Sequence, residues 1–397
     1  MSPARVGVIG AGMAGPVLAV YLKLKGYDPV IYERTNSISD AGLGIGIQRN
    51  GLRVLSGVPG LLEHINAHQI DSWEAYSVVE EDPGLLGTSD HPKKFRESGG
   101  FGVVTARRPA MLNRLVEFAE RSGVPVVWGH KLETLVQHDD SVTVTFSNGV
   151  QETFSFVVGC DGLHSNTRTC LFGEQPATYT GLSQWGGVSP KPKSMSGKAA
   201  NFDVFGNGCG MVIISVDDEE VIWAITVREP ESKETWRAID AAASEEFKHS
   251  EYSKWSYGAG EVVRNSTRIL RYGLYDRPEL SCWHKGRVVL IGDAAHPTSP
   301  HLGQGANQSY EDVGALIQLL EKYNPTAEPP STETLEAVFD ELEAVRVATS
   351  SAMVQNARTQ GEYRVKTGTE ECIARNNYYR KIIGSEEFYK FRFGGAK

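Results

Sequence analysis

The sequence predicts an α/β protein with a discontinuous Rossmann-like domain built on a parallel sheet, a β-rich second domain and a C-terminal helix. The chain of 397 residues opens with a strand, a glycine-rich turn, a helix and a second strand. Extended segments with polar breaks fill its middle, and a buried strand, a glycine-rich turn and a helix return near residue 290. Because a strand–helix–strand unit builds a parallel sheet, this late return predicts a sheet that is completed only after an insert.

The opening elements follow from hydrophobic periodicity. Residues 5–10 form an apolar run typical of a buried parallel strand, 13–25 have helical periodicity, and 28–33 form the second strand. A further helix is expected over 109–120, because its apolar residues recur on one face. Short strands are expected at 143–146 and 154–158.

The middle of the chain, residues 177–271, alternates extended segments with polar turns and predicts the β-rich insert. The first domain resumes with a strand at 287–291 and a helix at 305–321, and a long helix follows at 332–355. The expected division is a dinucleotide domain of residues 1–75, 100–176 and 272–325, a substrate domain of 76–99 and 177–271, and a C-terminal helical segment and tail of 326–397.

Net charge and cysteine content limit the kinds of partner and metal site that the protein can have. A formal net charge of −9 disfavours binding to nucleic acid or anionic membranes, so a small-molecule partner is expected. The five cysteines are odd in number and have no C-x-x-C spacing, which disfavours a disulfide framework and a zinc site. No metal is expected. The chain has neither a secretory signal pattern nor an apolar run long enough to span a membrane, so a cytoplasmic location is expected.

The first motif is Gly10-x-Gly12-x-x-Gly15, which follows a strand and opens a helix, with Glu33 at the end of the next strand. Such glycines allow a tight turn and close approach of a pyrophosphate to the backbone at the positive end of the helix dipole. The acidic residue would accept hydrogen bonds from a ribose. The pattern predicts dinucleotide binding and fits FAD as well as NAD.

Two more motifs stand at strand ends. A buried strand ends at Asp161-Gly162, and Ser165 is placed to cap the next helix, which contains Arg168. The strand at 287–291 ends at Gly292-Asp293, and the turn that follows leads through glycines into a helix. Polar ligand groups bind at such strand ends in doubly wound folds.

The three motifs, in this order and at these separations, resemble those of the class A, single-component FAD monooxygenases of the para-hydroxybenzoate hydroxylase and salicylate hydroxylase type. The resemblance covers about residues 4–320 and is loose in the insert and the tail. It implies that NAD(P)H reduces FAD, that O2 forms a C4a-hydroperoxyflavin, and that this species hydroxylates a small, electron-rich aromatic or specialised metabolite.

The resemblance also implies cofactor-binding residues. Arg108 resembles an arginine that contacts the FAD diphosphate or ribityl chain, with Arg107 as its neighbouring rival and a solvated helix-start charge as the alternative. Asp293 resembles the ribityl-binding acid, with a helix-cap role as the alternative, and Asp161 is either cofactor-binding or structural. The full expected set is Gly10, Gly12, Ala14, Gly15, Glu33, Arg34, Gly44, Gly46, Arg108, Asp161, Asp293, Pro300, Gly303, Gly305, Ala306 and Asn307.

The turn at residues 303–307 has a mechanistic interpretation. Backbone amides at the start of a helix, pointed at the pyrimidine edge of the isoalloxazine, would stabilise the negative charge of reduced flavin. Gly44 and Gly46 resemble the family's glycine-rich segment beside the ring; an ordinary loop is the alternative.

Three residues are expected on the substrate side. His301 is a candidate base or hydrogen-bond partner, against a structural histidine, and Gln48 and Trp185 are candidate pocket residues, against core packing. Relatives with a Trp-Arg-Gly pattern have an arginine where this chain has Gly186, which weakens any transfer of aromatic-acid specificity. Four further aromatic residues are expected either in the pocket wall or in the core: Trp223, Trp236, Trp255 and Tyr272.

Competing functions remain open. The same flavin chemistry supports epoxidation or ring-modifying oxygenation. A halogenase is disfavoured because the Trp-x-Trp-x-Ile-Pro pattern is missing. A flavin-binding scaffold or redox sensor is the alternative from a different class.

Overall fold

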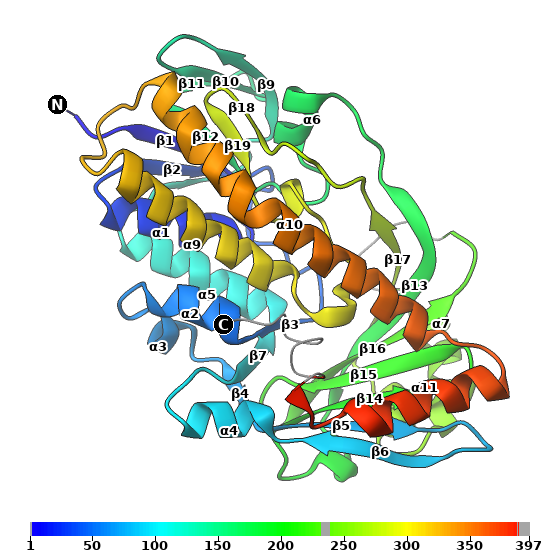
Figure 1. Ribbon diagram of the computed structural model, residues 1–397. Helices are drawn as coiled ribbons and strands as arrows, with labels where there is room; N and C mark the ends of the chain where they lie inside the picture. Colours follow the sequence, from blue (N-terminus) through cyan, green and yellow to red (C-terminus); the bar gives the residue numbers. More distant parts are fainter. Residues whose placement is uncertain (1, 232–238, 387, 389–397) are drawn as a thin grey trace.

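The computed structural model describes residues 2–231, 239–386 and 388. A helix-covered unit with a parallel sheet lies against a second unit built on a large sheet, and one long helix runs across both (Figure 1). This is the predicted α/β architecture with a C-terminal helix. Among the described residues, no helix combines the length and apolar character needed to cross a membrane.

The central sheet of the first unit is assembled from distant parts of the chain. Its strand order is β18-β19-β12-β1-β2-β8. Strand β1 pairs in parallel with both β2 and β12, and β12 pairs in parallel with β19. The discontinuous Rossmann-like domain is therefore confirmed, because the strand that follows the insert joins the sheet of the opening strands. The bounds are β1 Arg5–Ile9, β2 Asp28–Tyr32, β8 Val126–Val127, β12 Phe156–Gly159, β18 His284–Lys285 and β19 Val288–Leu290.

Helices cover one face of this sheet and a small antiparallel sheet covers the other. The helices α1 (Ala14–Leu24), α5 (Arg108–Arg121) and α9 (Gly305–Tyr323) pack on one face through a large apolar cluster. A second cluster joins the other face to β9 (Leu132–Gln137), β10 (Val142–Phe146) and β11 (Gln151–Phe154).

The predicted single strand at 154–158 is wrong in one respect. Phe154 ends β11 in the antiparallel sheet, whereas Phe156 begins β12 in the parallel sheet. Between them, the Ser155 amide donates to the carbonyl of Arg5, so the chain changes sheets without a turn. Apolar content alone does not distinguish one long strand from two short strands in different sheets.

The second unit is built on a seven-stranded sheet of order β17-β13-β16-β15-β14-β5-β6. The predicted β-rich insert is thus present, and two earlier strands extend its sheet. The expected domain boundaries at 76 and 271 fall inside β5 and β17, and they stay predictions. The bounds are β5 Ser72–Ser77, β6 Gly84–Ser89, β13 Thr178–Pro190, β14 Ala200–Phe205, β15 Cys209–Ser215, β16 Glu220–Arg228 and β17 Arg268–Asp276.

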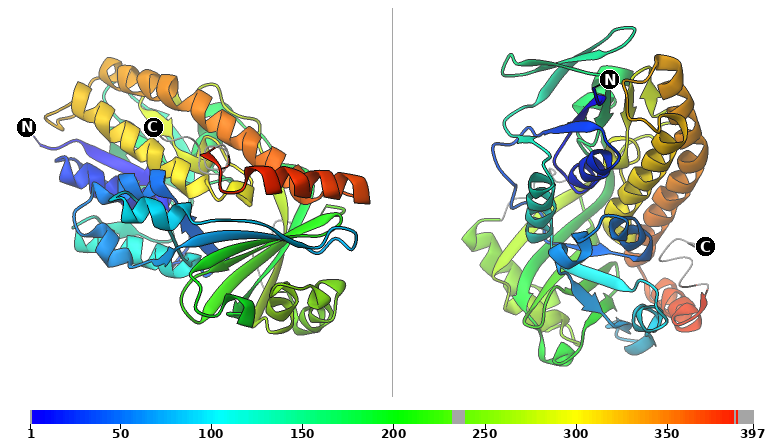
Figure 2. Two further views of the ribbon diagram at one scale, coloured as in Figure 1. Left: turned by 60° about the horizontal axis from the view of Figure 1, so that its bottom comes forward. Right: turned by 90° about the vertical axis from the view of Figure 1, so that its left-hand side faces the viewer.

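The two faces of this sheet have different neighbours. Alternate residues of its strands pack against α7 (Ala241–Lys248) and α8 (Ala259–Arg264), which cover one face, called here the outer face (Figure 2). The remaining residues point to the inner face, where Gly186 packs against Leu43 of the first unit: a Cβ on Gly186 would lie 2.5 Å from Leu43 Cδ1.

A third, small sheet lies beside this contact. Strand β7 (Val103–Arg107) pairs antiparallel with β3 (Gly44–Ile47) on one side and with β4 (His68–Ile70) on the other. Three helices connect these strands: α2 Arg49–Ser56, α3 Leu61–Ile65 and α4 His91–Glu97.

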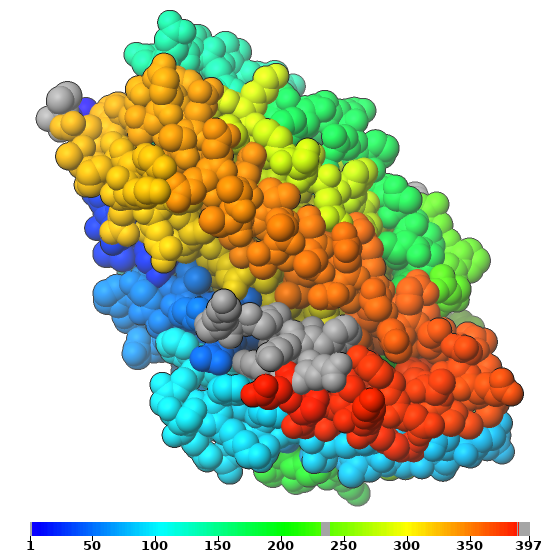
Figure 3. Space-filling model, in the orientation of Figure 1, coloured from blue at the N-terminus to red at the C-terminus, as the bar shows by residue number. Residues whose placement is uncertain are grey.

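The long helix α10 (Thr332–Arg364) joins the two units and is followed by α11 (Thr369–Ile382). Figure 3 shows both helices exposed along one side of the molecule. The helix α10 begins as predicted, with the side chain of Ser331 as its cap, and extends nine residues past the predicted end at 355. At its last turn, Arg364 forms a buried ion pair with Asp203 of β14, with 2.7 Å between Nη2 and Oδ1.

We expect Arg364→Met to lower the free energy of unfolding by about 3–5 kcal/mol, because it leaves the Asp203 carboxylate buried without its cation. Adding Asp203→Asn should recover much of the loss, since the amide oxygen can still accept from Trp73, which is 2.7 Å away in the native structure. Arg228→Met is the control: its pair with Glu362 is more than half exposed on both sides and should change stability by less than about 1 kcal/mol. Urea denaturation measures all three. Equal losses for Arg228→Met and Arg364→Met would contradict the account.

Candidate functional site

The glycine-rich turn between β1 and α1 has the conformation that its sequence predicts. Gly10 has φ +108°, and a Cβ there would lie 2.6 Å from the carbonyl oxygen of Cys160. A Cβ on Gly15 would lie 2.0 Å from the carbonyl oxygen of Gly10. Both positions therefore require glycine. A Cβ on Gly12 would meet only one neighbour, at 4.0 Å, so the backbone there is open to a ligand.

Glu33 lies across this turn at the end of β2. Its Oε2 accepts from the amide of Ala11, and its Oε1 accepts from the amide of Thr35, both at 2.9 Å. The carboxylate is thus fixed beside the start of α1, where Ala14 is buried. The neighbouring Arg34 is exposed.

The carboxylate of Asp161 forms hydrogen bonds with residues of the turn that follows it. It accepts from the hydroxyl of Ser165 at 2.5 Å, and from the amide and hydroxyl of Thr167 at 2.9 and 3.0 Å. Ser165 in turn caps α6 (Asn166–Phe172) by accepting from the amide of Arg168, as predicted. These contacts favour the structural alternative for Asp161, whose burial raises the pKa of its carboxyl group.

The two neighbouring arginines point in different directions. Arg107 pairs with Glu220 of the second unit at 3.0 Å. Arg108 packs over Gly42 and donates to the carbonyl of Ala41 at 3.0 Å. Burial lowers the pKa of Arg108, and the charge of Asp293 opposes that effect, so these two groups are close enough to interact.

The turn before α9 is tied to the segment after β3. Asn307 accepts from the amide of Gln48 at 2.8 Å and donates to the carbonyls of Gly46 and Gly303, at 3.1 and 2.8 Å. The Gln48 side chain donates to the carbonyl of Leu302 at 2.9 Å and accepts from Gln304 at 2.5 Å. Segments more than 250 residues apart in sequence therefore share one buried hydrogen-bond network.

The start of α9 is arranged to receive a ligand. Gly303 has φ +63°, and Gln304 at the cap position makes no side-chain bond to the first amides of the helix. Gly305 and Ala306 are partly exposed, and Pro300 and Gly303 are exposed.

A Cβ on Gly46 would have a single neighbour, at 3.9 Å, whereas one on Gly305 would lie 3.7 Å from Asp293 Oδ1. Uncapped amides, an open glycine backbone and a nearby carboxylate fit the edge of a flavin and its ribityl chain.

The buried carboxylate of Asp312, which the sequence did not single out, holds the turn that contains Gly292 and Asp293. Asp312 of α9 accepts from the amide of Gly292 at 2.9 Å, from His296 at 2.6 Å and from Arg346 of α10 at 2.8 Å. Gly292 has φ +60°, and its bond to Asp312 holds the turn that presents Asp293. Burial alone would raise the pKa of Asp312, but His296 and Arg346 lower it overall. In the sequence, Asp312 is one of several polar residues within the expected 305–321 helix, so no pattern distinguishes it.

The inner face of the large sheet presents three polar side chains near the contact with Leu43. The hydroxyl of Tyr272 donates to Gln184 at 2.6 Å, and the amide of Gln184 donates to Thr226 at 3.1 Å. All three residues are at most 5% exposed. Gln184 lies between Leu182 and Gly186 on the same face of β13, and Gly186 is the residue that packs against Leu43.

His301 lies in the short helix Pro300–Leu302, against Gly361 of α10 and close to Leu182. It is buried and lines a cavity of about 410 Å³. Charged side chains also line this cavity, among them Arg277, Arg358 and Glu362. His301 is therefore placed beside the predicted flavin turn, with access to a cavity.

Trp185 does not lie on the inner face. Its ring stacks on Phe247 at 4.4 Å between centroids, in the outer apolar cluster, with Arg271 over its ring. The expected pocket position is wrong and the core-packing alternative holds, because an odd-numbered residue of β13 faces away from Leu182, Gln184 and Gly186. Trp223 and Trp255 belong to the same cluster, and Trp236 lies outside the described residues.

Comparison with known proteins agrees with this arrangement. The FAD binding domain family model matches residues 3–357. The chain is 28% identical over 379 residues to 3-amino-4-hydroxybenzoate 2-monooxygenase of Streptomyces cremeus, covering 95% of this chain and 91% of that protein. It is 30% identical to 2-heptyl-3-hydroxy-4(1H)-quinolone synthase of Pseudomonas aeruginosa over 322 residues, covering 78% and 79% of the two chains.

The fold is matched by solved structures. The crystal structure of Klebsiella pneumoniae HpxO, complexed with FAD and uric acid, superposes with a TM-score of 0.84 at 20% identity. The superposition covers 98% of this chain and 96% of that chain.

We expect Asp312→Asn to weaken FAD binding by roughly tenfold, about 1.4 kcal/mol, because the turn that carries Asp293 loses its charged anchor. Stability should fall by about 3 kcal/mol, since Arg346 and His296 keep their burial without this carboxylate. Flavin fluorescence titration and urea denaturation measure the two effects. Glu311→Gln, which removes the more exposed partner of Arg346, is the control and should cost much less. Wild-type FAD affinity in Asp312→Asn would refute the role of this carboxylate.

The same network predicts an acid dependence. Because the pKa of Asp312 is below its ordinary value of about 3.9, its contribution is fully present above about pH 4 and is lost as pH falls through the folded-state pKa. A plot of stability against pH should therefore be flatter at acid pH for Asp312→Asn than for the wild type.

Proposed function

Since the chain belongs to the FAD-binding-domain family and is a class A FAD-dependent monooxygenase, we propose that it uses NAD(P)H and O2 to hydroxylate a small, electron-rich aromatic substrate. Two of its relatives are named for oxygenation of a hydroxybenzoate and formation of a hydroxyquinolone, both electron-rich rings. The observation that carries the proposal is the buried polar group of Gln184, Thr226 and Tyr272, which lies on the face of the sheet that contacts Leu43, just before the glycine segment.

The FAD would be held along one continuous path. We assign the adenosine and pyrophosphate to the turn of Gly10, Gly12 and Gly15 with Glu33, and the ribityl chain to Asp293 and Arg108. The isoalloxazine would lie between Gly46 and the start of α9. When bound, FAD supplies hydride acceptance from NAD(P)H and activation of O2.

The protein's contribution at the ring is electrostatic. The first amides of α9 have no side-chain cap, and they lie at the positive end of a 19-residue helix. Directed at the pyrimidine edge, they would stabilise the negative charge that develops there on reduction. Asn307 fixes their position through its bonds to Gly46 and Gly303.

Substrate orientation is assigned to the inner face of the large sheet. Tyr272, Gln184 and Thr226 offer one hydroxyl, one amide and one further hydroxyl in an otherwise apolar region with Leu270 and Leu274. Such a surface suits a flat ring with a few polar substituents. It would position the substrate carbon and exclude water, which otherwise diverts oxygen to hydrogen peroxide.

At Gly186, where relatives with a Trp-Arg-Gly pattern have an arginine, this chain has no space for a side chain. A side chain at Gly186 would meet Leu43 Cδ1 at 2.5 Å and the carbonyl of Trp223 at 2.9 Å. The structure thus explains why glycine stands there, and we infer that the substrate is held by neutral hydrogen bonds rather than by an ion pair from this residue. His301, at the edge of the same region, is proposed as the group that accepts or shares a substrate proton.

The five cysteines are all unpaired thiols. This state supports the proposal of a reducing compartment such as the cytoplasm.

The direct test is to purify the FAD-loaded protein and screen hydroxylated aromatic and bicyclic compounds for faster NAD(P)H oxidation. The expected result is a product that gains one oxygen atom from ¹⁸O2 by mass spectrometry, with the product structure separating hydroxylation from epoxidation or ring modification. If FAD binds but no compound accelerates NAD(P)H oxidation or gains oxygen, the scaffold or sensor alternative replaces the proposal.

We expect Tyr272→Phe to raise KM about two- to tenfold, the effect of losing one hydrogen bond. It should also divert more NAD(P)H to hydrogen peroxide, because the substrate is less firmly placed. FAD affinity should not change. Tyr275→Phe is the matched control: it lies three residues along β17, has its hydroxyl on Glu231, and faces away from the inner surface. Equal coupling in the two variants would contradict this assignment of the substrate side.

A further inference from the structure

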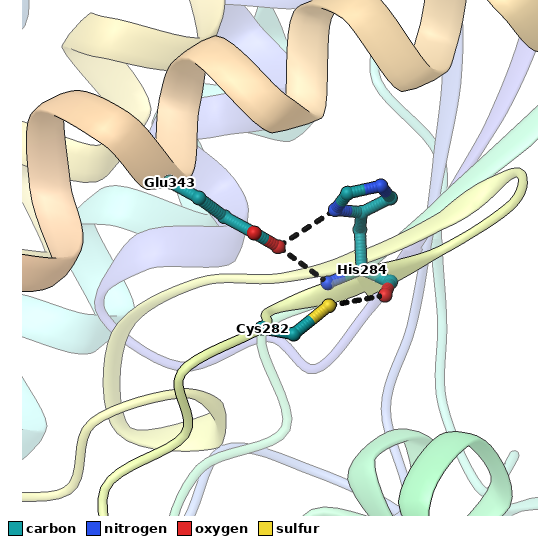
Figure 4. A group of neighbouring side chains, drawn as sticks. All are labelled: Cys282, His284 and Glu343. Atoms are coloured by element: carbon teal, nitrogen blue, oxygen red, sulfur yellow. Dashed lines mark hydrogen bonds and ion pairs between the residues drawn. The ribbon is translucent and has the colours of Figure 1, made fainter.

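A cluster of metal-binding side chains lies outside the flavin site, where β18 meets α10. Cys282 precedes β18 and its thiol donates to the backbone carbonyl of His284 at 3.1 Å, and Glu343 faces both residues from α10 (Figure 4). One donor atom from each residue, a sulfur, a nitrogen and an oxygen, lies within 4.8 Å of the other two.

The carboxylate of Glu343 is held in place by the strand. Its Oε1 accepts from the amides of Trp283 and His284, at 2.6 and 3.1 Å, and from Nδ1 of His284 at 2.6 Å. These three bonds all end on Oε1, so none of them occupies Oε2. The two backbone donors would keep the carboxylate in position when Nδ1 changes partner.

The second nitrogen of His284 faces another carboxylate. Its Nε2 lies 3.7 Å from Oδ1 of Asp340, one turn earlier on α10. When a histidine binds a metal through one nitrogen, a carboxylate near the other nitrogen orients the ring and strengthens the ligand. Asp340 has that position here.

The cluster is accessible to ions. Cys282 is exposed, and the side chains of His284 and Glu343 are 11% and 15% exposed. A set of one thiolate, one imidazole and one carboxylate suits Zn²⁺, whereas Mg²⁺ and Ca²⁺ prefer oxygen ligands alone. Three protein ligands leave a fourth tetrahedral position for water.

We propose that Cys282, His284 and Glu343 form a Zn²⁺ site that links α10 to β18, the strand that pairs with β19 just before the Gly292-Asp293 turn. The sequence alone disfavours a zinc site, because it contains no C-x-x-C spacing. The third ligand comes instead from a helix some 60 residues later, and the structure alone brings it to the strand. Binding to the folded chain alone would stabilise it. The proposal does not depend on the identity of the substrate.

The test uses the full-length, FAD-loaded protein after removal of metals by chelation. Titration with Zn²⁺ against a chromophoric chelator should show one tight site in the wild type. Cys282→Ser should weaken it by at least about 100-fold, and Asp340→Asn by about 10- to 100-fold. Cys170→Ser, which changes the other exposed thiol, is the matched control and should bind like the wild type.

Thermal unfolding gives a second readout: Zn²⁺ should raise the unfolding temperature of the wild type and of Cys170→Ser, but not that of Cys282→Ser. Equal Zn²⁺ affinity in the wild type and Cys282→Ser, including absence of binding in both, would overturn the proposal. If Cys282→Ser fails to fold, the absorption spectrum of the wild type with added Co²⁺ tests the site instead. A thiolate-to-cobalt absorption band, after subtraction of the flavin spectrum, supports the site, and a spectrum without that band refutes it.

Discussion

The side-chain amide of Asn307 joins the two parts of the chain on which the rest of the site depends. It binds the backbone on both sides of the space assigned to the isoalloxazine, at Gln48 and Gly46 on one side and at Gly303 on the other. The residue is fully buried, so these bonds are made away from competing water. An amide offers both a donor and an acceptor, which neither a carboxylate nor an apolar side chain of similar size could supply. Together with the bonds from the Gln48 side chain to Leu302 and Gln304, Asn307 fixes the separation between the glycine segment and the helix start.

The second unit completes the site because its large sheet packs against the first unit. Gly186 and Ile222 approach Leu43 and Gly44 so closely that neither glycine has room for a side chain. This contact places the even-numbered residues of β13 toward the flavin segments and assigns the odd-numbered ones to the outer core. It also supports the substrate proposal: the inner-face residues Gln184, Thr226, Leu270 and Tyr272 are apolar or neutral and polar, so they would select a substrate by shape and hydrogen bonding. The long helix α10 holds the arrangement together through Arg346 at one unit and Arg364 at the other.

Local patterns in the sequence predicted much of this fold. The opening strand–helix–strand unit and the start of α10 follow from periodicity, and α6 begins at its predicted cap. Features that depend on three-dimensional register could not be predicted. Trp185 is next in sequence to Gln184 and Gly186, which lie on the inner face. Only the pairing of β13 with β16 and β17 determines that Trp185 points to the outer face. Asp312 looks like any polar residue on a helix until Gly292, His296 and Arg346 surround it. The choice between Arg107 and Arg108 likewise depends on where Glu220 and Asp293 lie.

The most direct measurement is the crystal structure of the protein with FAD bound. The account predicts that the pyrimidine edge of the isoalloxazine lies between Gly46 and the amides of residues 305–307, with the ring facing Gln184 and Tyr272. Asn307 should keep its bonds to both segments. A flavin bound elsewhere, or a ring facing away from the inner sheet surface with Asn307 released, would contradict it.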